Sequence, residues 1–429
     1  MRRESMKRLL LVALSLSLLL SAAFGQLNFV STQFHPATER EYFEGSLLPS
    51  FTKLTNVKVQ FLPLTYEEAS TRIRAEQAAN RVSIGLFAEL QGGMELMASG
   101  GLLKDISGVT FNDRTFISTF EKFAQGYGIK QFVPWLQATF VMVVNKKAFD
   151  YLPKGLTKED VLKGTAKWTY YALLDWAKNI FDKTKMPMVG FPENPQGLFH
   201  RFLHGYLYPS FTGGQFVKFD SLDAVDMWEY LKELFNYVSP GSSTWSFMSE
   251  PLMRNEAWIV WDHTARIPAA VRSDPEQFIP VPVPAGPKGR GFITVLVGLA
   301  LPKNAPNETE AVKLIDYLTS PKIQFEILEK TGFFPVVEEA IGVIPAGPNK
   351  VLAEAVVAQA GTQDAMVSFI PGLGPKGGEF TAYYREAFRR IVYENEDIKK
   401  VLQDIGPKVY QTVKDAGAAL PQPDASLFH

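Results

Sequence analysis

Two of the five histidines, His200 and His204, stand four residues apart, the spacing that places two side chains on one helix face. The residues between them, Arg-Phe-Leu, do not form the His-Glu-x-x-His core of a zinc protease. No third ligand is evident, because His35, His263 and His429 are far away in the sequence. We therefore expect no metal site and no other cofactor.

Other catalytic signatures are also missing from the sequence. There is no Gly-x-Ser-x-Gly elbow, P-loop or dinucleotide fingerprint, and the glycine turns at 85–93 and 286–291 lack the spacing of a phosphate cradle. A glycosidase needs two paired carboxylates, and a chain with 45 acidic residues always offers candidates. No particular pair stands out in this sequence. We expect a binding protein and not an enzyme.

Residues 1–25 read as a signal peptide. Basic residues within 2–8 precede the apolar run Leu9–Leu20, and small residues at Ala23 and Gly25 fit a cleavage site. The apolar run is about half the length of a spanning helix. Gln26 stands where a lipid-anchored protein would have cysteine, and the chain has no cysteine. A soluble periplasmic protein is expected.

Charge and aromatic content narrow the range of ligands. A formal net charge of −1 with no basic run is no footprint for nucleic acid or an anionic membrane. The chain contains 32 Phe, 15 Tyr and 7 Trp, which fits aromatic cores and also a cleft lined by flat apolar rings.

The first third of the mature chain alternates strands and helices. Strands are predicted at 27–31, 57–61 and 82–87, with helices from about 38, over 66–80 and over 94–103. This order favours a parallel sheet with helices on both faces.

The stretch from Phe278 to Val336 is the most informative part of the chain. An extended Pro-rich segment leads through a glycine turn to a buried strand at 293–301, and two helices follow, separated by Ser320-Pro321. This order resembles the family 1 extracellular solute-binding proteins of ABC importers, the maltose-binding-protein-like group. Leu314–Gln324 and Thr331–Pro335 fill the matching positions.

Further segments resemble the same family in the same order. They are Tyr127–Phe149, where the family's chain crosses between lobes, and 167–178, 219–237 and 254–261. The resemblance spans about 27–416. It implies an α/β, type II periplasmic-binding-protein fold with two doubly wound lobes joined by hinge strands, in a monomer. The first lobe would hold 27–142 with 295–335, and the second 143–294 with 336–429.

Ligand-binding residues in such sheets follow the carboxyl ends of strands. Aromatic rings cover the C–H faces of a sugar, and amides, carboxylates and guanidinium groups hold its hydroxyls. This rule selects Gln33, Phe34, His35, Glu89, Gln91, Trp135, Gln137, Glu193, Trp245, Phe247, Trp261, Asp262 and His263. The resemblance adds Arg290 and Phe292 from the glycine turn and Phe334 from the family's late ligand loop.

Several of these residues also have a purely structural interpretation. Asp262 could cap the following helix, and His35 before Pro36 could be a turn residue. Trp135, Trp245 and Trp261 are favoured as contacts because polar residues flank them, whereas Trp168, Trp176 and Trp228 have helical core spacing.

The resemblance implies capture of a sugar or oligosaccharide and its delivery to a membrane permease. Two alternatives stay open. One is the same fold binding a polyamine, a peptide or a phosphoester such as glycerol phosphate, which Arg290 near the glycine turn would favour. The other is a secreted carbohydrate-active enzyme.

Overall fold

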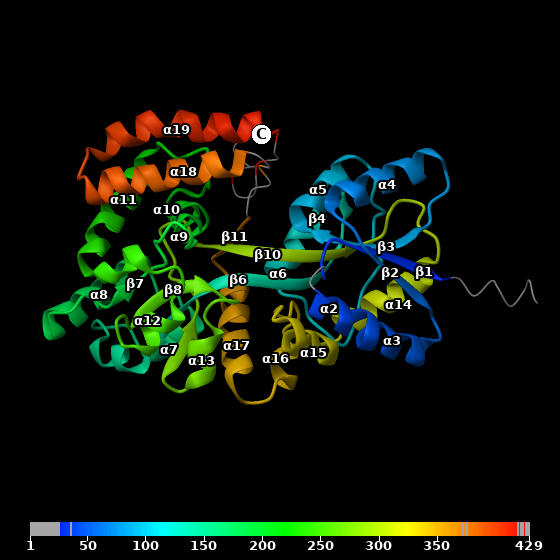
Figure 1. Ribbon diagram of the computed structural model, residues 1–429, viewed down its shortest axis with the longest axis horizontal. Helices are drawn as coiled ribbons and strands as arrows, with labels where there is room; N and C mark the ends of the chain where they lie inside the picture. The colour runs from blue at the N-terminus through cyan, green and yellow to red at the C-terminus, as the bar shows by residue number, and fades with distance from the viewer. Residues whose placement is uncertain are drawn as a thin grey trace, which may run out of the picture.

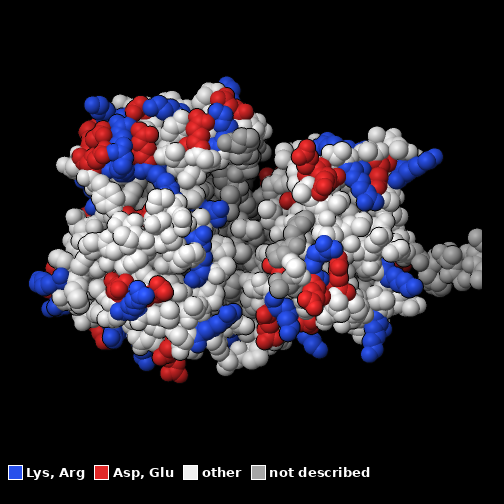
Figure 2. All heavy atoms as spheres, in the orientation of Figure 1, with Lys and Arg blue, Asp and Glu red and all other residues white. Residues whose placement is uncertain are grey.

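The computed structural model describes residues 26–34, 37–369, 373, 376–417, 420 and 424. Its helices and strands form two lobes, which appear as two masses separated by a furrow in Figure 2. Strands β6 and β10 run from one lobe into the other (Figure 1). The predicted α/β class and two-lobed architecture are confirmed.

The first lobe, on the right in Figure 1, is built on the predicted parallel strands. Strand β1 lies between β2 and β3 and pairs with both in parallel, with Phe29 opposite Phe61 and Leu86. Helix α4 begins at a capping box in which Thr65 and Glu68 exchange hydrogen bonds. The elements are β1 (Leu27–Ser31), α2 (Ala37–Tyr42), α3 (Leu48–Thr55), β2 (Val59–Pro63), α4 (Tyr66–Ala78), β3 (Ile84–Leu90), α5 (Gln91–Ser99) and α14 (Glu308–Thr319).

The two lobes share one hydrogen-bonded sheet with the strand order β2-β1-β3-β10-β6-β8-β7. Strands β6 and β10 are antiparallel to each other, and the ladder has a register shift between Val297 and Gly298. Strand β11 pairs with the second-lobe end of β10, and β9 pairs with the second-lobe end of β6. The strands are β6 (Val133–Asn145), β7 (Val189–Gly190), β8 (Ile259–His263), β9 (Phe278–Val281), β10 (Arg290–Ala300) and β11 (Ala365–Ser368).

Helices of the second lobe bury an aromatic-rich core, on the left in Figure 1. Trp168 and Trp176 are fully buried, and their indole N–H groups donate to the carbonyls of Pro282 and Ala148 at 2.8 Å. The helices are α7 (Lys158–Lys163), α8 (Tyr170–Thr184), α9 (Phe199–Phe202), α10 (Tyr208–Thr212), α11 (Leu222–Leu234), α12 (Ser249–Met253), α13 (Pro268–Ser273), α18 (Gly377–Phe388) and α19 (Ile398–Asp415).

A third group of elements lies near the crossing strands. Leu328, Phe334, Ile344 and Leu352 from this group share one buried cluster with Val143 of β6. The elements are α6 (Ser118–Phe123), β4 (Gln125–Gly126), β5 (Ile129–Lys130), α15 (Pro321–Thr331), α16 (Ala340–Val343) and α17 (Pro348–Gly361).

Candidate functional site

The carboxyl ends of the strands in the two lobes point toward the crossing of β6 and β10. In the first lobe, β3 ends at Leu90, which pairs with Val297 near the middle of β10. In the second lobe, β8 ends at His263, opposite Phe140 near the middle of β6. Residues at both strand ends therefore lie near the furrow between the lobes, where a ligand could touch both.

On the first-lobe side, Glu89 and Gln91 do not occupy a loop as predicted. Strand β3 extends through Leu90 and passes directly into α5 at Gln91, because pairing with β10 continues the strand. Glu89 is only 4% exposed, and burial raises the pKa of its carboxyl to about 7. The Gln91 amide donates to Glu95, whose pKa burial also raises to about 7.

The end of β1 places an aromatic residue in the core. Phe34 has a positive φ of 62°, which turns its ring onto Phe43 in a stack with centroids 4.7 Å apart. Its ring is also 5.5 Å from that of Trp135. Gln33 is half-buried, and its amide donates to the Thr32 hydroxyl at 3.1 Å. His35 lies outside the described residues.

The three predicted residues of the crossing segments are buried. Gln137 and Phe334 exchange two backbone hydrogen bonds of 3.1 and 2.8 Å, and the Gln137 amide donates to Pro335 at 2.7 Å. Trp135 is fully buried although polar residues flank it in the sequence, since the first-lobe aromatic cluster covers its ring. These side chains support the crossing from inside the protein.

In the second lobe, Trp261, Asp262 and His263 belong to β8 instead of following it, because β8 pairs with β6 through His263. Trp261 is fully buried and stacks on Phe140 with centroids 4.6 Å apart. Asp262 accepts backbone N–H groups from Met248 at 2.9 Å and His263 at 2.7 Å. Burial raises the pKa of Asp262 to about 7. It joins a loop to the strand end and does not cap α13.

The loops beside β7 and β8 contribute the most accessible of the predicted residues. Phe247 is 54% exposed and lies under the guanidinium of Arg266, 4.8 Å from it. Trp245 is half-buried against the core. Glu193 accepts the Tyr393 hydroxyl at 2.5 Å, and burial raises the pKa of its carboxyl to about 7.

Arg290 and Phe292 lie inside the second lobe. Arg290 is fully buried; its guanidinium donates to the carbonyls of Val283 and Gly164 and is 3.5 Å from the Asp364 carboxylate. Phe292 is likewise fully buried in β10. In this structure Arg290 therefore ties loops of the second lobe together from inside the protein.

Sequence reasoning missed three arginines near the second-lobe strand ends: Arg201 of α9, Arg266 after β8 and Arg385 of α18. Arg266 follows His263 by three residues, so the rule of strand ends could have found it. Arg201 was considered only for the spacing of its neighbouring histidines. Arg385 comes from a distant helix, and only the fold brings it close.

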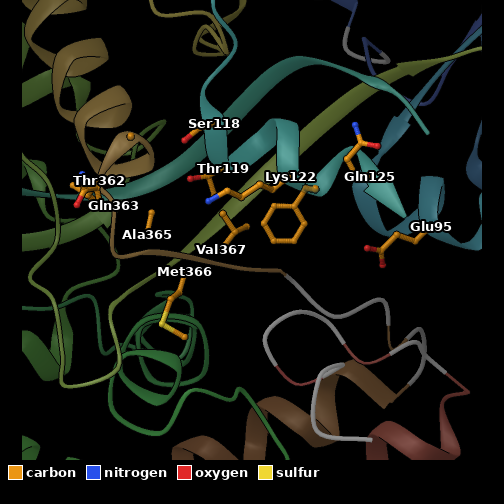
Figure 3. Close-up of a pocket in the computed structure, with 12 residues that line it drawn as sticks. Glu95, Ser118, Thr119, Lys122, Gln125, Thr362, Gln363, Ala365, Met366 and Val367 are labelled. Carbon is orange, nitrogen blue, oxygen red and sulfur yellow. The ribbon is translucent and has the colours of Figure 1, made fainter. Parts of the chain in front are cut away.

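A cavity of about 470 Å³ also opens between elements of both lobes (Figure 3). Its described lining comes from α5, α6, β4, the end of α17 with the turn that follows it, and β11, and includes no predicted residue. Glu95 and Lys122 are its charged groups, and Thr119 bonds to the Ala360 carbonyl at 2.8 Å. No sequence pattern marked this cavity, since its walls meet only in the folded chain.

The family of this chain follows from its sequence match. A family model described as bacterial extracellular solute-binding protein matches residues 35–325. The chain belongs to this family. The resemblance inferred from the sequence is thus confirmed.

Solved structures similar to this solute-binding protein share its fold. The sugar-binding protein MalE from Xanthomonas citri has 14% identity and a TM-score of 0.68, covering 91% of this chain and 98% of its own. The cyclic alpha-maltosyl-1,6-maltose binding protein from Arthrobacter globiformis has 16% identity, a TM-score of 0.61 and coverages of 91% and 99%. UgpB from Mycobacterium tuberculosis, solved in complex with glycerophosphocholine, has 16% identity and a TM-score of 0.58, covering 91% of this chain and 99% of its own. No curated protein matches the sequence significantly.

Two further observations describe this solute-binding protein. Within the described ranges, no His, Cys, Asp and Glu side chains gather in a group of three or more that could hold a metal ion. None of the helices described has the length and apolar character needed to span a membrane.

Proposed function

We propose that this protein is the periplasmic substrate-binding component of an ABC importer, which captures a sugar or oligosaccharide and delivers it unaltered to the permease. The observation that carries the proposal is the meeting of strand carboxyl ends from both lobes at the furrow. Solved relatives of the same fold include proteins whose names state binding of maltose-type sugars. Signal-peptide cleavage after residue 25, the periplasmic location and a monomeric state are parts of this proposal.

The predicted ligand-binding residues remain proposed, in two roles. Those with exposed or half-buried side chains, such as Phe247, His263 and Gln33, would contact the ligand directly. The buried ones would hold those contacts in place. Some buried polar atoms of these residues have no hydrogen-bond partner among the described residues. Native proteins leave few buried polar atoms unpaired, so this observation supports the strand ends as a ligand site. The unpaired atoms include those of Glu89, Trp135, Gln137, Glu193 and Trp261.

Binding would work through closure of the lobes. We assign 27–142 with 295–335 to the first lobe and the remainder of the mature chain to the second. A ligand that contacts both strand ends only when the furrow narrows stabilises the closed form by that difference in contact energy. The permease would then recognise the closed shape.

The experiment is a thermal-shift screen of the purified protein against a panel of mono- and oligosaccharides, followed by analysis of the recovered ligand. We expect at least one sugar to raise the melting temperature and to be recovered chemically intact. A cleaved sugar would identify an enzyme. If glycerophosphocholine or a polyamine raises the melting temperature and no sugar does, the transported solute is not a sugar.

A further inference from the structure

Three arginines are held in fixed positions at the furrow end of the second lobe. The Arg201 guanidinium is 5.8 Å from the ring centroid of Phe140, the residue opposite the end of β8. The Arg266 guanidinium lies over Phe247 and donates to the Ser246 carbonyl at 3.3 Å. Arg385 donates to the carbonyls of Pro195 and Gly197 at 2.9 and 3.0 Å. We call Arg201, Arg266 and Arg385 the furrow arginines.

The furrow arginines are close enough to act on shared neighbours. The ring of His263 contacts the same Phe140 ring edge-on at 4.7 Å, and the backbone N–H of Arg266 donates to the His263 carbonyl at 2.7 Å. Burial, and then the charges of all three arginines, lowers the pKa of His200 to about 3. Burial, followed by Arg201 and Arg266, lowers that of His263 to about 4. Both histidines are therefore neutral at pH 7, and the positive charge belongs to the arginines.

No acidic side chain of the described residues forms an ion pair within 4.0 Å of a furrow arginine. Asp262 is the acid whose charge Arg266 influences, but its oxygens already accept the N–H groups of Met248 and His263. The undescribed internal residues near α18, 370–372 and 374–375, are Ile-Pro-Gly and Gly-Pro and bring no acid. The cluster thus keeps its positive charge.

Keeping half-buried arginines together without a counter-charge is unfavourable for the ligand-free protein. Donor capacity is also unused, since Arg385 Nε is buried without a partner in the described part of the chain. A planar guanidinium matches the two oxygens of a carboxylate or phosphate better than any neutral group. An anion from outside the protein would supply the missing counter-charge.

We propose that the ligand is an anionic saccharide, whose carboxylate or phosphate binds the furrow arginines while its hydroxyls meet the first-lobe strand ends. This inference rests on the proposed function and narrows it to one class of solute. On the first-lobe side, the half-buried Gln33 offers an amide suited to hydroxyls, and the buried Glu89 and Gln91 hold the strand end in place.

The test is titration calorimetry with matched ligands on the full mature chain. The panel contains neutral oligosaccharides, the uronic-acid oligosaccharides of the same length, and sugar phosphates, with glycerophosphodiesters and dicarboxylates as non-sugar anions. We expect an acidic saccharide to bind at least about 10-fold more tightly than its neutral counterpart, with affinity falling as salt rises. The uronate and phosphate arms identify the source of the charge.

Arg201→Met should weaken the acidic ligand about 10- to 100-fold and leave the neutral one within about 2-fold. Arg390→Met is the matched control, because Arg390 pairs with acids on the outer helices; it should change neither affinity. If Arg201→Met does not fold, two measurements on the natural protein test the proposal instead. They are the salt dependence of its affinity for the acidic saccharide and the ratio of its affinities for the acidic and neutral saccharides.

Each outcome has a distinct meaning. Equal or tighter binding of the neutral sugar overturns the anionic inference and leaves the proposed sugar transport standing. If only a non-sugar anion binds, and its binding depends on Arg201, the proposal of a sugar ligand is overturned and the proposal of an anion site is retained. No binding by any anion in the panel overturns the inference outright.

Discussion

Arginines in two regions of the second lobe have opposite surroundings. On the outer helices, Arg390 meets Glu396 at 2.9 Å, Asp404 at 2.7 Å and Glu386 at 3.5 Å. At the furrow, Arg201 and its two companions meet aromatic rings and backbone carbonyls instead. The chain carries 45 acidic residues, so acids were available for both regions. The difference indicates that the outer arginines stabilise the fold, whereas the furrow arginines keep their charge for another molecule.

The first lobe provides the strongest example of a structural arginine, and its loss should have the largest effect. Arg114 has a side chain only 2% exposed and bonds to Asp113, Asp316 and the Thr319 hydroxyl. Arg114→Met should lower the free energy of unfolding by about 3 kcal/mol, because the Asp316 carbonyl and the buried Thr319 hydroxyl lose their donor and several bonds break together. Urea denaturation measures this. If the free energy of unfolding falls by less than about 1 kcal/mol, the contrast between fold-stabilising arginines and the furrow arginines is not supported.

The opposite wall of the furrow should show a pH effect of intermediate size. Burial raises the pKa of Glu89 to about 7 from 4.5, so between these values the folded state holds a proton that the unfolded state releases. The contribution of Glu89 to stability is therefore present below pH 4.5 and lost as pH rises through 7. Between pH 4.5 and 8, the free energy of unfolding of Glu89→Gln should therefore rise by up to about 3 kcal/mol relative to that of the natural protein.

Chemical denaturation at several pH values checks the Glu89 prediction. Glu67→Gln is the control, because Glu67 is exposed on α4. Its difference from the natural protein should stay constant across the same range. Parallel curves for the two variants would mean that Glu89 is charged and solvated in the folded protein.

The smallest expected effect concerns the furrow arginines in the ligand-free protein. Arg201→Met relieves repulsion from Arg266, so it should raise the free energy of unfolding by about 0.5 kcal/mol at low ionic strength. The gain should disappear in about 0.5 M salt, where the charges are screened. Melting curves at two salt concentrations measure it. A destabilised variant at low salt would show that Arg201 serves the fold, as Arg114 does.

Hydrophobic periodicity was sufficient to predict much of the fold. Strand β1 was predicted at 27–31, where the structure has it, and the parallel pairing of the first three strands is confirmed. Family motifs gave the two lobes. Strand ends were less predictable, because pairing with β6 and β10 extended β8 and β3 through residues expected in loops.

The site could be predicted only by position along strands. Polar neighbours in the sequence suggested accessible rings for Trp135 and Trp261, but the cover over each ring comes from residues far away, such as Phe29 and Phe202. Arg385 reaches the furrow from α18, and β11 pairs with β10 across a long separation. Such contacts depend on tertiary packing, which local patterns do not encode.

The ladder between β3 and β10 also sets an order of events during biosynthesis. Leu90 pairs with Val297, and Phe87 with Ala300, so the amino-terminal lobe lacks a central strand until the ribosome has made most of the chain. Until then, β3 in the nascent protein has an unpaired edge, the kind of edge that invites aggregation. The lobe whose translation begins first thus waits for a strand that is made much later, and this non-local pairing should make its folding slow.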